Sequence, residues 1–239
     1  MDTIKFKKKN TLVIAHRGLS GIERENTNSA FVAAGNRSYY GIETDIYKTA
    51  DGQFVCSHDE TLKRVSGEDI SVENVSLSVL ENIVLFDKDG TKNRADLRPC
   101  SVENYISICK KYEKHCILEL KSDFTTDEIK KLINICKKLE YLDNITFISF
   151  GYENLVKIRK ILPKQSVQYL FEEMTEDNIN KSISNKFDVD VAFEALTKEN
   201  IKRFHDAGIK VNCWTVDDKN VAEKLVAMGV DYITSNILE

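Results

Sequence analysis

The sequence has only two prolines, Pro99 and Pro163, among its 239 residues, and no stretch rich in glycine and serine divides it. It also lacks any apolar run approaching the roughly 18 residues that a membrane-spanning helix requires. The N-terminal segment MDTIKFKKKN has no apolar stretch of the kind that a secretory signal carries. These absences predict one domain over residues 1–239 that is cytoplasmic and has no stable insertion into a membrane.

Neither sign of charge dominates the sequence. With 34 basic and 38 acidic residues, the net charge is -4, which gives no electrostatic reason to expect nucleic acid as a partner. The six cysteines are scattered without a C-x-x-C spacing, and several lie in apolar runs such as YISICKKY, where a thiol behaves as a small hydrophobe. We therefore expect neither a disulfide framework nor a zinc site. The composition makes no prediction of the oligomeric state.

The chain does contain a regular alternation of short apolar segments with longer amphipathic ones. Eight segments have strand character: 12–15, 40–47, 116–121, 145–150, 166–171, 189–194, 210–216 and 230–235. Strands separated by helices predict a parallel sheet with right-handed crossovers, and eight such units predict an α/β fold of the (β/α)8 TIM barrel type. A doubly wound open sheet is the alternative, but no G-x-G-x-x-G turn follows the first strand.

Residues of about 48–100 interrupt this alternation. The segment YKTADGQFVCSHD predicts a hairpin, because Asp51-Gly52 is a strong turn signal. A mostly polar stretch follows and is too short to predict an independent domain. We therefore expect a small insertion between the second and third barrel strands.

Acidic side chains are concentrated at the C-terminal ends of predicted strands, where barrel enzymes carry their active sites. Glu43 and Asp45 are two residues apart and so point to the same face of their strand, and Glu119 lies on the neighbouring strand. Three carboxylates without His or Cys partners favour one hard divalent cation, Mg²⁺ or Ca²⁺. Solvent-facing acids of an edge strand would be the alternative, which fits poorly with a parallel strand covered by helices.

Two of the four histidines fall near the same predicted mouth of the barrel. His16 follows the first strand and His58 follows the hairpin. A single histidine after a strand is more often structural than catalytic, but two beside the acids favour general acid–base chemistry. His115 and His205 lie before a strand and late in a helix, so neither receives a role.

Arg17 and Lys121 place positive charge next to the acids. Together with a metal ion, these cations form the arrangement expected around a phosphoryl group. Arg17 could instead simply pair with Glu43. Trp214, the only tryptophan, ends the seventh predicted strand and belongs either to the core or to the wall of a substrate site.

On these residues the chain resembles the glycerophosphodiester phosphodiesterase family, whose members are (β/α)8 barrels. The matching motifs are AHRG, ENT, GIETDIYKTADGQFVCSHDETLKR, LELK and WTV, in family order between residue 15 and about residue 216. The resemblance implies metal ligation by Glu43, Asp45 and Glu119, acid–base catalysis by His16 and His58, phosphate contacts by Arg17 and Lys121, a substrate-site wall at Trp214, and a supporting role for Glu25. TLKRVSGED lacks the family's threonine-rich continuation, and TSN replaces its usual Asp- and Pro-containing ending.

The resemblance implies a metal-dependent hydrolysis of a small-molecule glycerophosphodiester to glycerol 3-phosphate and an alcohol through a cyclic phosphate. A lysophospholipase D-like or phospholipase C-like activity shares these features, and residues 72–86 are the only candidate for an apolar, lipid-binding rim. A non-catalytic binding protein would lack at least one of the proposed metal ligands or histidines, and all of them are present. The head group, the choice of cation and the histidine that first acts as base remain open at this point.

Overall fold

The computed structural model describes residues 2–239. Eight parallel strands form its main sheet in the order β10-β1-β2-β5-β6-β7-β8-β9. Their bounds are β1 (Leu12–Ala15), β2 (Gly41–Lys48), β5 (His115–Leu120), β6 (Ile145–Ser149), β7 (Val167–Phe171), β8 (Asp188–Ala192), β9 (Val211–Trp214) and β10 (Tyr232–Ser235). All eight correspond to the strands predicted from the sequence.

The two end strands of this order, β9 and β10, lie beside each other. The backbone N–H of Asp231 donates to the carbonyl of Val211 at 2.9 Å, and that of Val216 donates to the carbonyl of Thr234 at 3.0 Å. Asn212 Nδ2 adds a bond to Thr234 Oγ1 at 3.2 Å. The sheet therefore curves round on itself as a (β/α)8 barrel, as predicted, and the open doubly wound alternative is wrong.

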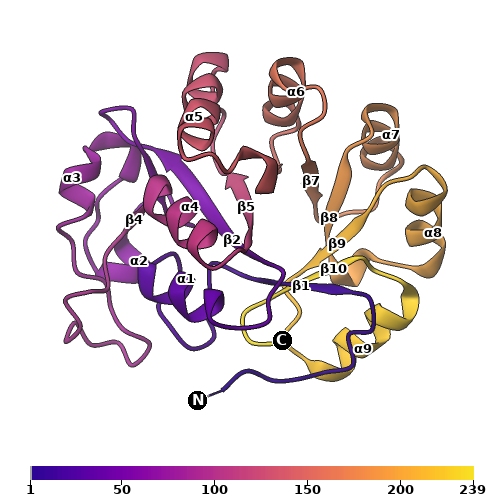
Figure 1. Ribbon diagram of the computed structural model, residues 1–239, viewed down its shortest axis with the longest axis horizontal. Coiled ribbons are helices and arrows are strands. Elements are labelled where there is room, and N and C mark those ends of the chain that lie inside the picture. The colour runs from indigo at the N-terminus through magenta and orange to yellow at the C-terminus, as the bar shows by residue number, and fades with distance from the viewer. Residues whose placement is uncertain (1) are drawn as a thin grey trace.

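The longer helices cover the outside of the strands, and the view in Figure 1 shows α5 to α9 placed around them. Their bounds are α1 (Asn28–Gly35), α4 (Val102–Lys111), α5 (Thr126–Lys138), α6 (Tyr152–Ile161), α7 (Glu176–Asn185), α8 (Lys198–Asp206) and α9 (Lys219–Met228), with single 3₁₀ turns η2 (Leu142–Asn144) and η3 (Phe193–Ala195). In α5, a capping box between Thr125 and Glu128 begins the helix, and the apolar side chains of one face, Ile129, Leu132, Ile133 and Cys136, are buried. Within residues 2–239, no helix has the length and apolarity needed to cross a membrane.

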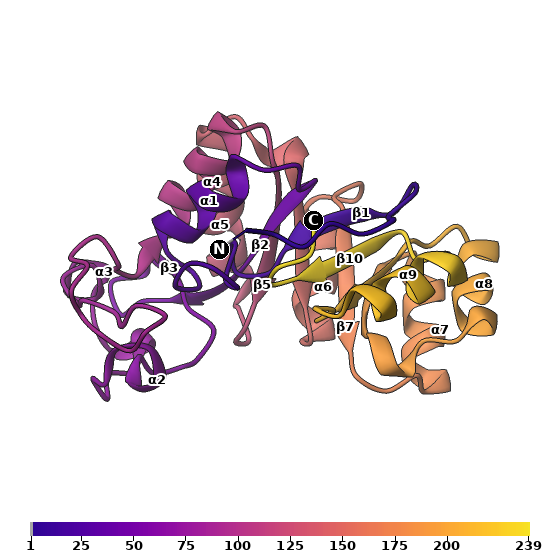
Figure 2. The ribbon, with the colours of Figure 1, turned by 90° about the horizontal axis from the view of Figure 1, so that it is seen from below.

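The predicted insertion is present and lies at one side of the barrel (Figures 1 and 2). It contains β3 (Phe54–Cys56), α2 (Lys63–Ser66), η1 (Val72–Asn74), α3 (Leu77–Leu80) and β4 (Cys100–Ser101). Strand β3 pairs antiparallel with β2 through the predicted hairpin, in which Gly52 adopts a φ of 70°. The insertion has a hydrophobic cluster separate from the main core, formed by Val55, Leu62, Val65, Val72, Leu80, Leu85 and Leu97.

Candidate active site

A cavity of about 300 Å³ lies at the C-terminal ends of the barrel strands. Seven of the nine predicted site residues line it: His16, Arg17, Glu43, His58, Glu119, Lys121 and Trp214. The other two, Asp45 and Glu25, contact the guanidinium of Arg17. The structure therefore brings all nine predicted residues to one place.

Three carboxylates form the centre of the site. Glu43 and Asp45 lie on one face of β2, and the register of β2 with β5 sets Asp45 directly opposite Glu119. One ligand atom from each lies within 4.8 Å of the others, and all three residues are buried. Three buried oxygen donors at this spacing fit a divalent cation, and the absence of a nitrogen or sulfur donor favours Mg²⁺ or Ca²⁺ over zinc.

The electrostatics of this cluster also fit a cation. Burial raises the pKa of Glu43 well above its usual value, and the charges of Asp45 and Glu119 raise it further. Burial and Asp45 likewise raise the pKa of Glu119 to about 7, against the opposing effect of Lys121. Burial also acts on Asp45, but Arg17 and Lys121 hold its pKa below the usual value. The two cations thus hold only the pKa of Asp45 below its usual value, and a metal ion can supply the further positive charge that Glu43 and Glu119 need to be ionised.

Lys121 and Arg17 reach the acids from different strands. Lys121 Nζ lies 2.8 Å from Glu119 Oε1 and 3.5 Å from Asp45 Oδ1. Arg17 Nε lies 3.4 Å from Asp45 Oδ2. The guanidinium of Arg17 does not pair with Glu43, which was one interpretation of the sequence. Glu43 Oε2 instead accepts from the backbone N–H of Arg17 at 2.7 Å, and the Arg17 side chain extends to Glu25.

The backbone after β1 turns sharply to place these groups. Arg17 and Gly18 both have positive φ angles, of 54° and 78°. A Cβ atom on residue 18 would lie only 2.7 Å from the backbone carbon of Ala30 in α1, which no side chain tolerates without a shift. Glycine at this position therefore allows the turn and the close approach of α1 together.

His16 has an uncharged hydrogen-bond partner. Its Nδ1 lies 2.8 Å from Asn236 Oδ1, and the Asn236 amide is oriented because its Nδ2 donates to Asp217 Oδ2 at 2.6 Å. Nδ1 therefore carries the proton, which leaves Nε2 as an acceptor. Burial, with the charge of Arg17, lowers the pKa of His16 to about 4, so the ring is neutral near pH 7.

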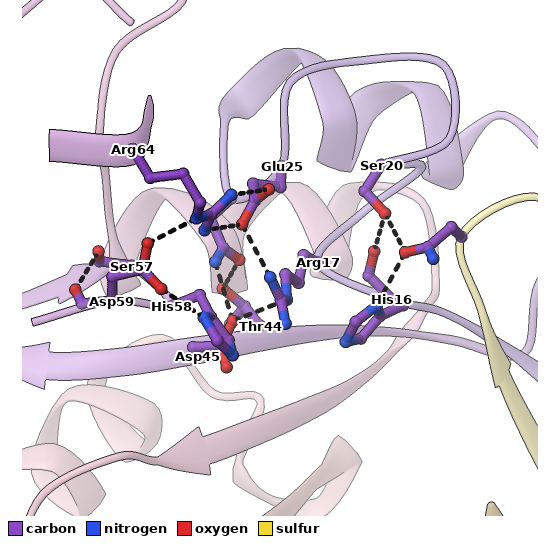
Figure 3. Close-up of polar contacts among 12 residues, drawn as sticks. His16, Arg17, Ser20, Glu25, Thr44, Asp45, Ser57, His58, Asp59 and Arg64 are labelled. Carbon is purple, nitrogen blue, oxygen red and sulfur yellow. Dashed lines mark hydrogen bonds and ion pairs between the residues drawn. The ribbon is translucent and has the colours of Figure 1, made fainter. Parts of the chain in front are cut away.

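His58 has a carboxylate partner instead. Its Nδ1 lies 2.7 Å from Asp59 Oδ1, a contact that fixes the orientation of the ring (Figure 3). Asp59 Oδ2 accepts from Nε of Arg64 in α2 at 2.6 Å, and the same guanidinium binds Glu25. Figure 3 shows Arg64 between Asp59 and Glu25, with Glu25 in turn bound to Arg17. Asp59 and Arg64 lie within the quoted HDETLKR segment, but only their contacts indicate what they do.

Asn26 is a further residue whose place the sequence did not predict. Its neighbour Thr27 caps α1, and the Thr27 hydroxyl accepts from the N–H of Ala30. Asn26 is buried and donates from Nδ2 to Asp45 Oδ2 at 2.9 Å, while its Oδ1 accepts from Thr44 at 2.8 Å. It therefore orients a proposed metal ligand.

The other half of the cavity is more apolar. Trp214 is partly exposed and its ring meets Phe150 edge to face, with centroids 5.8 Å apart. Leu170 and Ile148 complete this wall. Trp214 thus lines the cavity rather than filling the core. Phe150 was missed as a site residue, although its position at the end of a predicted strand would have allowed it.

The fold and the site together define a (β/α)8-barrel enzyme with a carboxylate cluster, two histidines and two cations at the C-terminal mouth. The chain matches the model of the glycerophosphoryl diester phosphodiesterase family over residues 16–238, and it belongs to this family.

Relatives and solved structures agree with this assignment. The chain is 28% identical over 229 residues to a glycerophosphodiester phosphodiesterase of Caldanaerobacter subterraneus, covering 95% of this chain and 94% of the relative. A glycerophosphodiester phosphodiesterase from Parabacteroides distasonis shares 27% identity at a TM-score of 0.78, covering 96% and 94% of the two chains. A phosphodiesterase from Oleispira antarctica, solved with the product sn-glycerol-3-phosphate, shares the fold at a TM-score of 0.86 with 23% identity, covering 94% and 92%.

Proposed function

We propose that this enzyme hydrolyses glycerophosphodiesters to glycerol 3-phosphate and an alcohol, with one divalent cation held by Glu43, Asp45 and Glu119. The observation that carries the proposal is the meeting of these three buried acids with both histidines and both cations around one cavity. The product in the Oleispira antarctica complex supports glycerol 3-phosphate as the product here.

The bound cation, Mg²⁺ or Ca²⁺, supplies Lewis-acid stabilisation of phosphate charge and lowers the pKa of a substrate hydroxyl. Arg17 and Lys121 bind the phosphate oxygens and stabilise the negative charge that grows on them during the reaction. Glu25 keeps the Arg17 guanidinium in place through the 2.9 Å bond to its Nη1. Trp214 packs against the organic part of the substrate.

The hydrogen-bond partners of the two histidine rings indicate which histidine acts first as base and which as acid. His16, neutral and with a free Nε2, removes the proton from the glycerol 2-hydroxyl, which attacks phosphorus to form a cyclic 1,2-phosphate. His58, which Asp59 orients through its Nδ1, donates a proton to the departing alcohol oxygen. Water then opens the ring with the two roles exchanged, which restores both histidines and releases glycerol 3-phosphate.

A deacylated, small-molecule substrate is favoured over a lipid. Residues 72–86 were the only candidate for an apolar rim, and three of their apolar side chains, Val72, Leu80 and Leu85, are buried in the cluster of the insertion, whereas Val79 is exposed. A single exposed valine is a small surface for a lipid chain, which supports a small-molecule substrate over lysophospholipase D-like and phospholipase C-like activities. We also infer that the chain, with its insertion, acts as one domain, because Arg64 of the insertion contacts Glu25 of the barrel.

Release of glycerol 3-phosphate from a panel of glycerophosphodiesters tests this function. The purified protein is treated with a chelator, dialysed, and assayed with glycerophosphocholine, glycerophosphoethanolamine and a long-chain lysophosphatidylcholine before and after addition of Mg²⁺ or Ca²⁺. We expect cation-dependent release of glycerol 3-phosphate from the first two substrates and little turnover of the lipid. Failure to cleave any glycerophosphodiester with either cation, or a preference for the lysophospholipid, would overturn the proposal.

A further inference from the structure

The cavity contains a fourth buried acid that the proposed mechanism does not use. Asp190 lies on β8 and lines the cavity, with an exposed fraction of only 2%. In the closed order of the eight strands, β8 is four strands away from β2 in either direction. Asp190 therefore lies across the barrel from Glu43 and Asp45 and is separate from the proposed metal ligands.

One oxygen of the Asp190 carboxyl lacks the hydrogen bond that a purely structural buried acid makes. Its Oδ1 is buried and has no partner among the described residues 2–239. The side chain of Asn212, its register partner on β9, lowers the pKa of Asp190 through a hydrogen bond, but its amide also donates to Gln168 Oε1 at 3.3 Å and to Thr234 Oγ1 at 3.2 Å. Because buried polar groups are almost always hydrogen-bonded, an unsatisfied carboxyl on a cavity wall points to a ligand that satisfies it.

Asp188, two residues earlier on the same strand, shows the contrast. It lies toward the other end of the barrel, and its Oδ1 accepts from the backbone N–H of Lys210 at 2.8 Å. That bond gives Asp188 a structural role. Asp190 has the same side chain, on the same face of the same strand, but no such bond.

The burial of the cavity walls indicates which part of a substrate reaches Asp190. Phe150 and Glu172 are exposed and form its rim, whereas Asp190 and Thr234 are buried. The alcohol of a phosphodiester varies between substrates and needs an open exit, so it extends toward the rim. The glycerol moiety then occupies the buried side, where its 2-hydroxyl faces the phosphorus and its terminal hydroxyl is free.

We propose that Asp190 binds the terminal hydroxyl group of the substrate's glycerol moiety and makes the enzyme selective for glycerol over its deoxy analogue. This inference rests on the proposed function. A carboxylic acid in its neutral form both donates and accepts a hydrogen bond, as a hydroxyl group does. Burial raises the pKa of Asp190 well above its usual value and Glu119 raises it further, against a smaller lowering by the hydrogen bond of Asn212, and this direction favours the neutral form.

The test compares two substrates in three proteins. The substrates are glycerophosphocholine and the analogue whose terminal glycerol hydroxyl is replaced by hydrogen, which keeps the 2-hydroxyl. The proteins are the wild type, Asp190→Ala and the matched control Asp188→Asn. For the wild type and the control, we expect kcat/KM to be about tenfold lower on the analogue than on glycerophosphocholine, which is the loss typical of one hydrogen bond. For Asp190→Ala, kcat/KM on glycerophosphocholine should be about tenfold below that of the wild type, and kcat/KM on the analogue should be no lower than on glycerophosphocholine.

Three outcomes would overturn the proposal: a wild type that does not discriminate between the two substrates, an Asp190→Ala variant that still does, or a control that loses discrimination. If Asp190→Ala does not fold, the near-isosteric Asp190→Leu replaces it with the same expectation. The proposed function fails separately, because an enzyme without phosphodiesterase activity cleaves neither substrate in any of the proteins.

Discussion

Arg64 binds both carboxylate oxygens of Glu25, at 2.8 and 2.9 Å. Its Nε donates to Asp59 in addition, at 2.6 Å. Glu25 holds Arg17 and Asp59 holds His58, so one side chain of the insertion sets the orientation of a proposed phosphate contact and of a proposed acid–base group. Contacts of this kind orient a reactive group without touching the substrate.

Replacing Arg64 should therefore impair both functions at once. We expect Arg64→Met to lower kcat about 10- to 100-fold through His58 and to raise KM through Arg17, by analogy with the loss of other orienting contacts. Arg64→Lys should recover only part of the activity, because lysine cannot bind Glu25 with two parallel bonds. Steady-state kinetics over pH 5–9 provide the measurement, since a misplaced His58 also shifts the pH profile.

Arg203 offers a matched control for Arg64. It binds both oxygens of Glu176 at 2.6 and 2.7 Å, on the surface and away from the cavity. Arg203→Met should leave kcat and KM unchanged. Equal kinetics for Arg64→Met and Arg203→Met would show that the Arg64 network does not position the site.

Replacing either of the two proposed acid–base residues should lower activity without unfolding the protein. His16→Ala and His58→Ala are each expected to lower kcat by about 10²- to 10⁴-fold, the usual contribution of general acid–base catalysis. His205→Ala serves as the control, because His205 is exposed and pairs with Asp231. Circular dichroism and thermal unfolding should match the wild type in all three variants. Near wild-type turnover in both site variants would contradict the assignment.

Removal of one carboxylate should abolish the response to the cation. In the wild type, millimolar Mg²⁺ or Ca²⁺ should raise the melting temperature, because binding to the folded state stabilises it. Glu43→Gln should lose this increase, and without cation it should melt at a higher temperature than the wild type, since burial and like charges disfavour the Glu43 carboxylate. An unchanged cation response would argue against Glu43 as a ligand. Glu176→Gln, on the surface, should keep the wild-type response.

Glu25 should make stability depend on pH. Burial opposes its ionisation, but the hydrogen bonds and charges of Arg64 and Arg17 lower its pKa from 4.5 to about 2. A carboxyl with a lowered folded-state pKa stabilises the fold above its unfolded pKa, and this stabilisation disappears as the pH falls from 4.5 toward 2. The free energy of unfolding of the wild type should therefore exceed that of Glu25→Gln by about 3 kcal/mol at pH 7. Urea unfolding should show this difference shrinking below pH 4, and a constant difference would contradict it.

The sequence allowed prediction of those features that depend only on residues close together in the chain. Barrel strands were recognisable because their apolar runs alternate with helical periodicity, and Glu43 and Asp45 were paired correctly because residues i and i+2 of a strand share a face. Arg64 could not be assigned in this way, because its contact with Glu25 spans 39 positions and depends on how the insertion packs. Asp190 resembled any acid in an alternating strand, and only the closed barrel shows that it is buried and unpaired.

The insertion has a hydrophobic cluster apart from the barrel core, and it contributes His58 as well as Arg64. Small units with their own core often open at a lower free-energy cost than the whole molecule. Activity should then respond to heat before the barrel does: turnover should fall at temperatures where the far-ultraviolet signal of the barrel is still intact, and return on cooling. The working temperature of this enzyme would thus be set by a segment of about 50 residues rather than by its barrel.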